Sequence, residues 1–128
     1  MSEVIQSPAA EAISKAAHAY WDEVAAIKDK YNFYPESIDH LTLSEMDTIQ
    51  RIGGAEMLNA LNRFNTAIES HMPCLMACEV AASTALATAC LENFTTIFKA
   101  MNFYFELRKQ QADALFANAI PANTGLNS

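Results

Sequence analysis

The sequence predicts an all-α protein: a three- to four-helix antiparallel bundle with one long C-terminal helix. Apolar residues recur at alternating spacings of four and three along three segments, which is the spacing of one helix face. The three glycines and four prolines gather at a few points, and none lies between Cys74 and Ala119. No segment shows the apolar–polar alternation of a half-buried strand. Together these patterns favour helices joined by short connections.

The first helix is predicted from Ser7 to Tyr31. Ser7 can cap its first turn, Pro8 suits the first helical position, and Glu11 complements the positive end of the helix dipole. The apolar stripe consists of Ile13, Ala17, Tyr20, Val24, Ile27 and Tyr31. Pro35 then disfavours a helical conformation in the residue before it, so a connector is expected after this helix.

Two further helices are predicted before Pro73. Thr42 and Glu45 in the letters TLSE form a capping box, which predicts a short helix over residues 43–52. We expect Gly53-Gly54 to end or kink this helix, and a third helix to begin near residue 55. The stripe of the third helix consists of Met57, Leu61, Phe64 and Ile68.

Residues 74–119 are predicted to form one long helix, or two helices joined by a tight turn, after the interruption at Pro73. The expected stripe is Val80, Thr84, Ala87, Leu91, Phe94, Phe98, Met101 and Phe105. The first half is rich in small residues. We therefore expect it to be buried and to be the most crowded part of the fold, with Glu79 paired to a base or at the end of the bundle. The second half is aromatic, and its consecutive rings at 103–105 cannot all face one core.

Composition and charge predict one domain over residues 7–120, flanked by flexible tails at 1–6 and 121–128. The chain of 128 residues is 52% hydrophobic and only 18% charged, so it has apolar surface to spare for a partner. The net charge of −7 argues against direct nucleic-acid binding, which needs a basic face.

Location is predicted from the first residues and the cysteines. The start of the chain lacks the features of a signal peptide, and three cysteines do not suggest a disulfide framework, so we expect a cytoplasmic protein. Residues 73–91 have the length of a membrane span. They contain Glu79 and many small residues, so membrane association is not expected.

The stretch ESHMPCLMACEV, residues 69–80, concentrates sulfur and imidazole groups. On a continuous helix His71, Cys74 and Cys78 would share one face, and these groups suit a soft metal such as zinc or copper(I). Pro73 interrupts such a helix, so the favoured interpretation is that both cysteines pack between helices as small apolar side chains. No cofactor is therefore expected.

Catalytic patterns do not emerge. The chain has no phosphate-binding loop, no glycine-rich dinucleotide turn and no Glu-x-x-His step, so we do not expect an enzyme. His18 and Asp22 lie one turn apart, but no nucleophile accompanies them. The aromatic residues at 20–21 and 31–34 either line a ligand pocket or dock the first helix on the bundle.

The expected function is that of a small, acidic, non-catalytic helical protein that assembles through coiled-coil-like contacts, first with itself as a homo-oligomer and then with other proteins. The residues expected in contacts between chains are Phe94, Phe98, Phe103, Tyr104, Phe105 and Phe116. One alternative is a bundle that binds a soft metal or a small apolar ligand near His71, Cys74 and Cys78.

A second alternative is an amphipathic coat on an apolar surface such as a storage granule. The letters FELRKQQADALFANA, residues 105–119, are similar in composition and period to granule-coating phasins. This resemblance implies a helix that lies on the granule with its apolar face. A third alternative is an acidic inhibitor that docks on a basic nucleic-acid enzyme, since most of the acidic residues lie in the first half of the chain.

Overall fold

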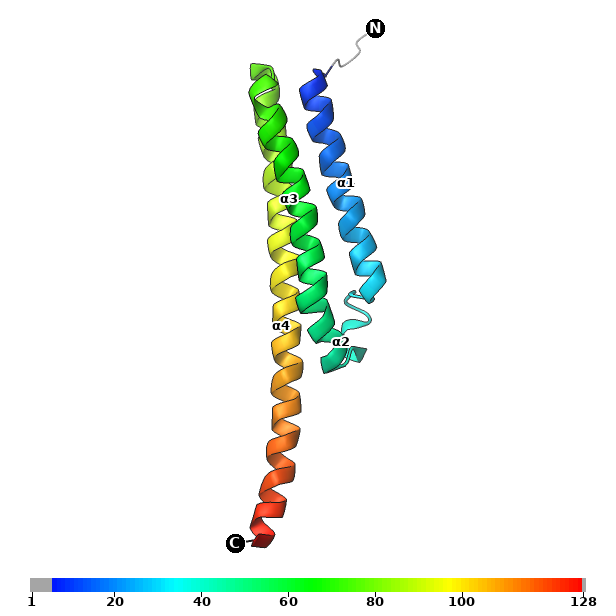
Figure 1. The fold of residues 1–128 in the computed structure, drawn as a ribbon, viewed down its shortest axis with the longest axis vertical. Helices are drawn as coiled ribbons and strands as arrows, with labels where there is room; N and C mark the ends of the chain where they lie inside the picture. Colours follow the sequence, from blue (N-terminus) through cyan, green and yellow to red (C-terminus); the bar gives the residue numbers. More distant parts are fainter. Residues whose placement is uncertain (1–5, 128) are drawn as a thin grey trace.

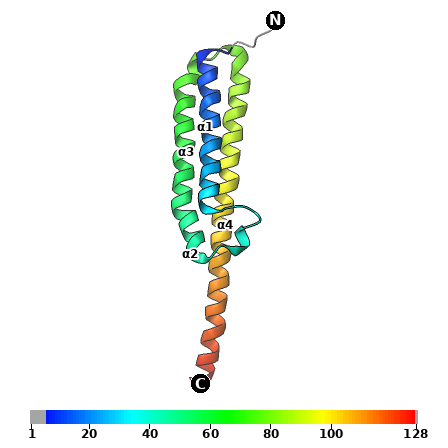
Figure 2. The ribbon, with the colours of Figure 1, turned by 90° about the vertical axis from the view of Figure 1, so that its right-hand side faces the viewer.

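A computed structural model describes the backbone of residues 6–127 and the side chains of residues 6–118. This part of the chain is all-α, as predicted, and is built from three long helices that run alternately down and up (Figure 1). The last helix continues well beyond the other two (Figure 2). The predicted tails at 1–6 and 121–128 lie outside the described side chains, except for Gln6, and stay predictions.

The first helix, α1 (Pro8–Tyr31), has the predicted ends and the predicted buried face. The Ser7 side chain accepts a hydrogen bond from the backbone N–H of Ala10 at 3.1 Å, and Asn32 ends the helix in a left-handed conformation with φ 54°. Five predicted stripe residues are buried, namely Ile13, Ala17, Tyr20, Val24 and Ile27. The stripe fixes which face of α1 packs on the other helices.

The chain is helical from α2 (Leu43–Thr48) to α3 (Gly54–His71), so the glycine pair does not end the helix, which was one of its two expected effects. The capping box at Thr42 and Glu45 is confirmed, but residues 49–53 form a π-helical turn that leads directly into α3. Gly54 has an ordinary helical φ of −60°. A Cβ atom there would lie only 3.1 Å from Cε1 of Phe98, so the absent side chain allows close packing on the last helix.

Pro73 marks a reversal of the chain. Two 3-10 turns, Met72–Cys74 and Ala77–Glu79, lead into α4 (Val80–Asn127), which is one continuous helix. The predicted stripe is partly wrong, because Val80, Thr84 and Leu91 are exposed. The buried positions are Ser83, Cys90, Ile97 and Met101. The predicted stripe and the observed buried positions both follow the spacing of one helix face, but the face that α4 buries lies next to the predicted one.

The expectation that the small-residue half of α4 is buried and crowded is also wrong. Ala81, Ala82 and Ala85 are exposed. The reason is the arrangement of its neighbours: α4 contacts α1, α3 and, through residues 43–53, the α2 segment, and these positions of α4 face away from them. The small side chains of this half of α4 therefore lie on its outer face and not in a close contact between helices.

The core lies between the three long helices, where α1 packs most extensively on α3. The large, fully buried side chains are Tyr20, Phe64, Ile13, Met46, Ile49, Met57 and Met101. The Tyr20 hydroxyl donates a hydrogen bond to Oδ1 of Asn93 at 3.0 Å, which ties α1 to α4, and burial raises the pKa of Tyr20. None of the described helices is long and apolar enough to cross a membrane.

Leucine substitutions at Cys90 and Ala85 should separate the inner and outer faces of α4. Cys90 is fully buried, so Cys90→Leu should lower the free energy of unfolding by about 1–3 kcal/mol through overpacking. Ala85 is exposed, and Leu is a good helix former, so Ala85→Leu should change stability by less than about 0.5 kcal/mol. Urea unfolding measures both. Equal destabilisation by the two substitutions would contradict the observed orientation of α4.

Candidate interaction surface

The six aromatic residues predicted for contacts between chains fall into two groups. Phe94 and Phe98 stack on each other, with ring centroids 5.2 Å apart. Both also pack partly within their own bundle, as do Tyr104 and Phe105. The exposed pair is Phe103 and Phe116, with exposed fractions of 60% and 66%.

Arg108 marks the place where α4 leaves the bundle. Its guanidinium donates hydrogen bonds to the carbonyl oxygens of Leu41 at 2.9 Å and Ile38 at 2.8 Å, and its side chain is only 12% exposed. Both acceptors belong to the connector between α1 and α2. Arg108 therefore fastens α4 to the base of the bundle. Nothing in the sequence around Arg108 indicates that two backbone carbonyls face this position.

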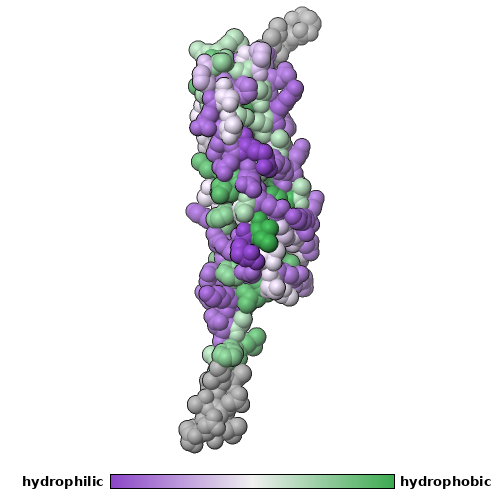
Figure 3. Space-filling view, viewed as in Figure 1, coloured by the Kyte–Doolittle hydropathy of each residue, from purple (hydrophilic) through white to green (hydrophobic). Residues whose placement is uncertain are grey.

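Beyond Arg108 the helix stands alone. We call residues 109–118 the α4 extension. Figure 1 and Figure 2 show α4 continuing below α2 without another helix beside it. Leu115 is 73% exposed and Phe116 is 66% exposed, although both are large and apolar. On the face drawn in Figure 3, apolar atoms are scattered along the bundle but gather just below it, next to the grey end.

The apolar face of the α4 extension continues the face by which α4 packs in the bundle. Ile97 and Met101 are buried, and spacings of three and four lead on through Arg108 to Ala112 and Leu115. Phe116 follows Phe105 by about three helical turns. One stripe is thus covered by α1, α3 and the α2 segment above Arg108 and is uncovered below it.

The structure does not bring the predicted metal ligands together. α3 ends at His71, and the 3-10 turns after it remove the continuous helix that would align His71, Cys74 and Cys78. Among the described residues, no group of three or more His, Cys, Asp or Glu side chains is placed to hold a metal ion. Cys74 and Cys78 are exposed, so the prediction that they pack between helices is wrong.

The buried cysteine is Cys90, which lies in the core of the bundle. Burial raises the pKa of its thiol to about 11. At neutral pH the Cys90 thiol is therefore protonated and acts as a small apolar side chain.

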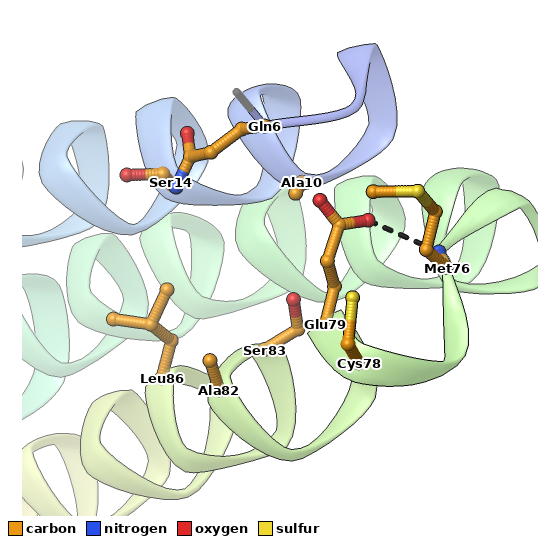
Figure 4. A pocket seen from close by; sticks show the side chains of 9 residues that line it. All are labelled: Gln6, Ala10, Ser14, Met76, Cys78, Glu79, Ala82, Ser83 and Leu86. Atoms are coloured by element: carbon orange, nitrogen blue, oxygen red, sulfur yellow. Dashed lines mark hydrogen bonds between the residues drawn. The ribbon is translucent and has the colours of Figure 1, made fainter. Parts of the chain in front are cut away.

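A groove of about 280 Å³ lies between the starts of α1 and α4 and is drawn in Figure 4. The Glu79 carboxylate in it accepts hydrogen bonds from the Ser7 N–H at 2.9 Å, the Ser7 hydroxyl at 2.6 Å and the Met76 N–H at 3.0 Å. These hydrogen bonds, chiefly those from Ser7, lower the pKa of Glu79. Glu79 thus lies at the end of the bundle, as predicted, where its carboxylate is already engaged by the chain itself.

The aromatic residues near the end of α1 dock this helix, which was one of the two predicted roles. The Tyr31 hydroxyl donates to Oε1 of Glu56 at 2.5 Å, and Nζ of Lys30 lies 2.9 Å from Oε2 of Glu56. Hydrogen bonds from Tyr31 and Lys30 lower the pKa of Glu56. Phe33 is buried edge-on against Tyr104, with ring centroids 6.5 Å apart.

Removal of the Arg108 guanidinium should destabilise the bundle. Arg108→Gln leaves the carbonyls of Ile38 and Leu41 without their donor, so we expect a loss of about 1–3 kcal/mol in the free energy of unfolding. Lys109→Gln removes a neighbouring exposed charge and should be nearly neutral. Urea unfolding of both variants measures the difference. A stable Arg108→Gln protein would show that the connector does not depend on these bonds.

The Glu79 hydrogen bonds should make stability depend on pH in the acid range. A carboxyl whose pKa is lowered by folding stabilises the fold above its ordinary titration range and loses this effect as the pH falls through the lowered value. The wild type should therefore exceed Glu79→Gln in unfolding free energy at neutral pH, and the difference should shrink below about pH 4.

The control for this experiment is Glu92→Gln, which changes an exposed carboxylate on α4. Its difference from the wild type should stay small across the same range. Urea unfolding between pH 3 and pH 7 compares the three proteins. A difference for Glu79→Gln that does not change with pH would contradict the role of the hydrogen bonds.

Comparison of the chain with protein-family models, curated proteins and solved structures finds no match. No residue role therefore comes from a relative. The α4 extension is the surface whose geometry requires an explanation, and the function is inferred from it.

Proposed function

We propose that the protein is a non-catalytic assembly protein that binds a second copy of itself through the α4 extension. The observation that carries this proposal is the uncovered stripe below Arg108, where Leu115 and Phe116 are mostly exposed. The same stripe is covered by α1, α3 and the α2 segment within the bundle. A second helix with the same stripe would cover it in the same way.

The α4 extension has no neighbouring helix to pack on, and most of the stability of helices in proteins comes from such packing rather than from helix propensity. Burial of a Leu or Phe side chain contributes about 1.5–3 kcal/mol, so pairing with another helix stabilises the extension as well as the contact. An amphipathic helix gains most of its stability from such packing.

Charge does not oppose the pairing of two extensions. The charged residues within the extension are Lys109 and Asp113, which balance each other. The net charge of −7 is carried by the rest of the chain. Two extensions can therefore approach each other without net electrostatic repulsion. The bundles carry the negative charge, so two bundles repel each other.

The other expected functions have less support. A coat on an apolar surface needs a long continuous apolar face, and on the face drawn in Figure 3 apolar and polar side chains are interspersed along the bundle. A soft-metal site needs converging ligands, and His71, Cys74 and Cys78 lie on different elements. Pairing of two α4 extensions, by contrast, needs only the apolar side chains that are already exposed on the extension.

The proposal is tested by sedimentation equilibrium of the full chain from micromolar to submillimolar concentration. We expect a reversible dimer. The double variant Leu115→Gln/Phe116→Gln should weaken dimerisation at least about a hundredfold, because it removes the apolar side chains at the centre of the proposed contact. The matched control is Leu91→Gln, which changes a 54% exposed leucine on the bundle part of α4 and should leave dimerisation unchanged.

Circular dichroism of each variant shows whether the fold survives the substitution. A monomeric mass for the wild type at the highest concentration would refute the proposal. Equal weakening by Leu91→Gln would move the contact from the α4 extension to the bundle.

A further inference from the structure

We infer that two copies pair through their α4 extensions in antiparallel orientation, so that the bundles lie at opposite ends of an elongated dimer. This inference rests on the proposed function and adds the geometry of the contact to it. The occupant of the uncovered stripe is the α4 extension of a second copy.

The direction of the stripe excludes parallel pairing. A partner helix that packs on Leu115 and Phe116 lies below α1 and α3, on the same side of α4. In a parallel pair this partner would continue upward into the space beside the buried Ile97 and Met101, which α1, α3 and the α2 segment already occupy. α4 is one unbroken helix of 48 residues, so it does not turn away at the base of the bundle.

Antiparallel pairing avoids this clash. The partner enters from below, and its α4 extension takes the place that α1 and α3 occupy higher on α4 (Figure 1). The partner's bundle then lies beyond the far end of the contact. The two-fold axis is perpendicular to the helices, and the same residues are buried in both copies.

Arg108 limits how far the two copies slide together. It holds the connector at residues 38 and 41 against α4, so this connector blocks the stripe directly above the extension. The overlap therefore begins after Arg108 in each copy. Antiparallel pairing also places the C-terminal end of each helix beside the start of the partner's extension, where opposed helix dipoles attract each other.

The buried area predicts a concentration-dependent dimer. Complete burial of Leu115 and Phe116 in both copies removes on the order of 500 Å² of side-chain surface. Stable complexes bury about 1,200 Å² or more, and smaller contacts are weak or transient. A dimer in the micromolar range or above fits this area.

Small-angle X-ray scattering distinguishes the two orientations by length. At 1.5 Å per residue the 48 residues of α4 span about 72 Å, and a parallel dimer is about as long. Residues 80–108 of α4 lie within the bundle and span about 44 Å, and residues 109–127 beyond it span about 28 Å, so an antiparallel dimer in which only the parts beyond Arg108 overlap reaches about 115 Å. The measurement is made on the full chain at a concentration where sedimentation shows the dimer.

Energy transfer between dyes on Cys78 gives a second readout. Cys78 is exposed and lies at the end of the bundle away from the α4 extension, whereas Cys90 is buried and its raised pKa keeps it unreactive. The other exposed cysteine is removed by Cys74→Ser. Donor-labelled and acceptor-labelled copies are mixed at the dimer concentration, and Leu115→Gln/Phe116→Gln in the same background gives the transfer of unpaired copies.

The expected result is a dimer of about 115 Å without transfer above that of the double variant. A dimer of about 75 Å with strong transfer would overturn the antiparallel arrangement and leave self-association through the extension in place. A mass above that of a dimer would also overturn the two-fold pairing. A monomer at every concentration would overturn the inference together with the proposed function.

Discussion

The difference in length between α4 and its neighbours is the constraint on which the rest of the structure depends. α4 has 48 residues, whereas α1 has 24 and α3 has 18. Helices bury their apolar stripes only where a neighbour runs beside them. The shorter helices therefore cover the upper part of α4, and the apolar side chains below Arg108 are left exposed.

Polar groups fasten the bundle at both ends, and the apolar core lies between them. Glu79 joins the start of α1 to the turn before α4 at one end, and Arg108 joins α4 to the connector at the other. The Glu79 carboxylate and the Arg108 guanidinium each form hydrogen bonds with backbone groups outside a regular helix. Such backbone groups need partners when they are withdrawn from water. The described side chains contain no buried nitrogen or oxygen atom without a partner. Together these two sets of hydrogen bonds fix the position of α4 along α1 and α3.

Sequence alone determined those features that depend on neighbouring residues. Ser7 and the capping box at Thr42 fix helix starts through hydrogen bonds that span three residues, and Pro8 favours a helix start through its fixed φ. These signals can be read without knowledge of the fold. The stripe of α1 is equally local, because one dense row of apolar residues leaves a single face to bury. The all-α class and the long last helix follow from the same periodicity and from the absence of glycine and proline between residues 74 and 119.

Tertiary structure alone decided which face of α4 is buried, where the cysteines lie and where the bundle ends. α4 is apolar or small on most sides, so two neighbouring rows fit a core equally well, and contact with α1 and α3 selects the row of Cys90 and Ile97. The exposure of Cys74 and Cys78 follows from the turns after His71, which a spacing of four residues does not reveal. Arg108 meets the carbonyls of residues 38 and 41 across about seventy residues of chain, and such contacts leave no local pattern.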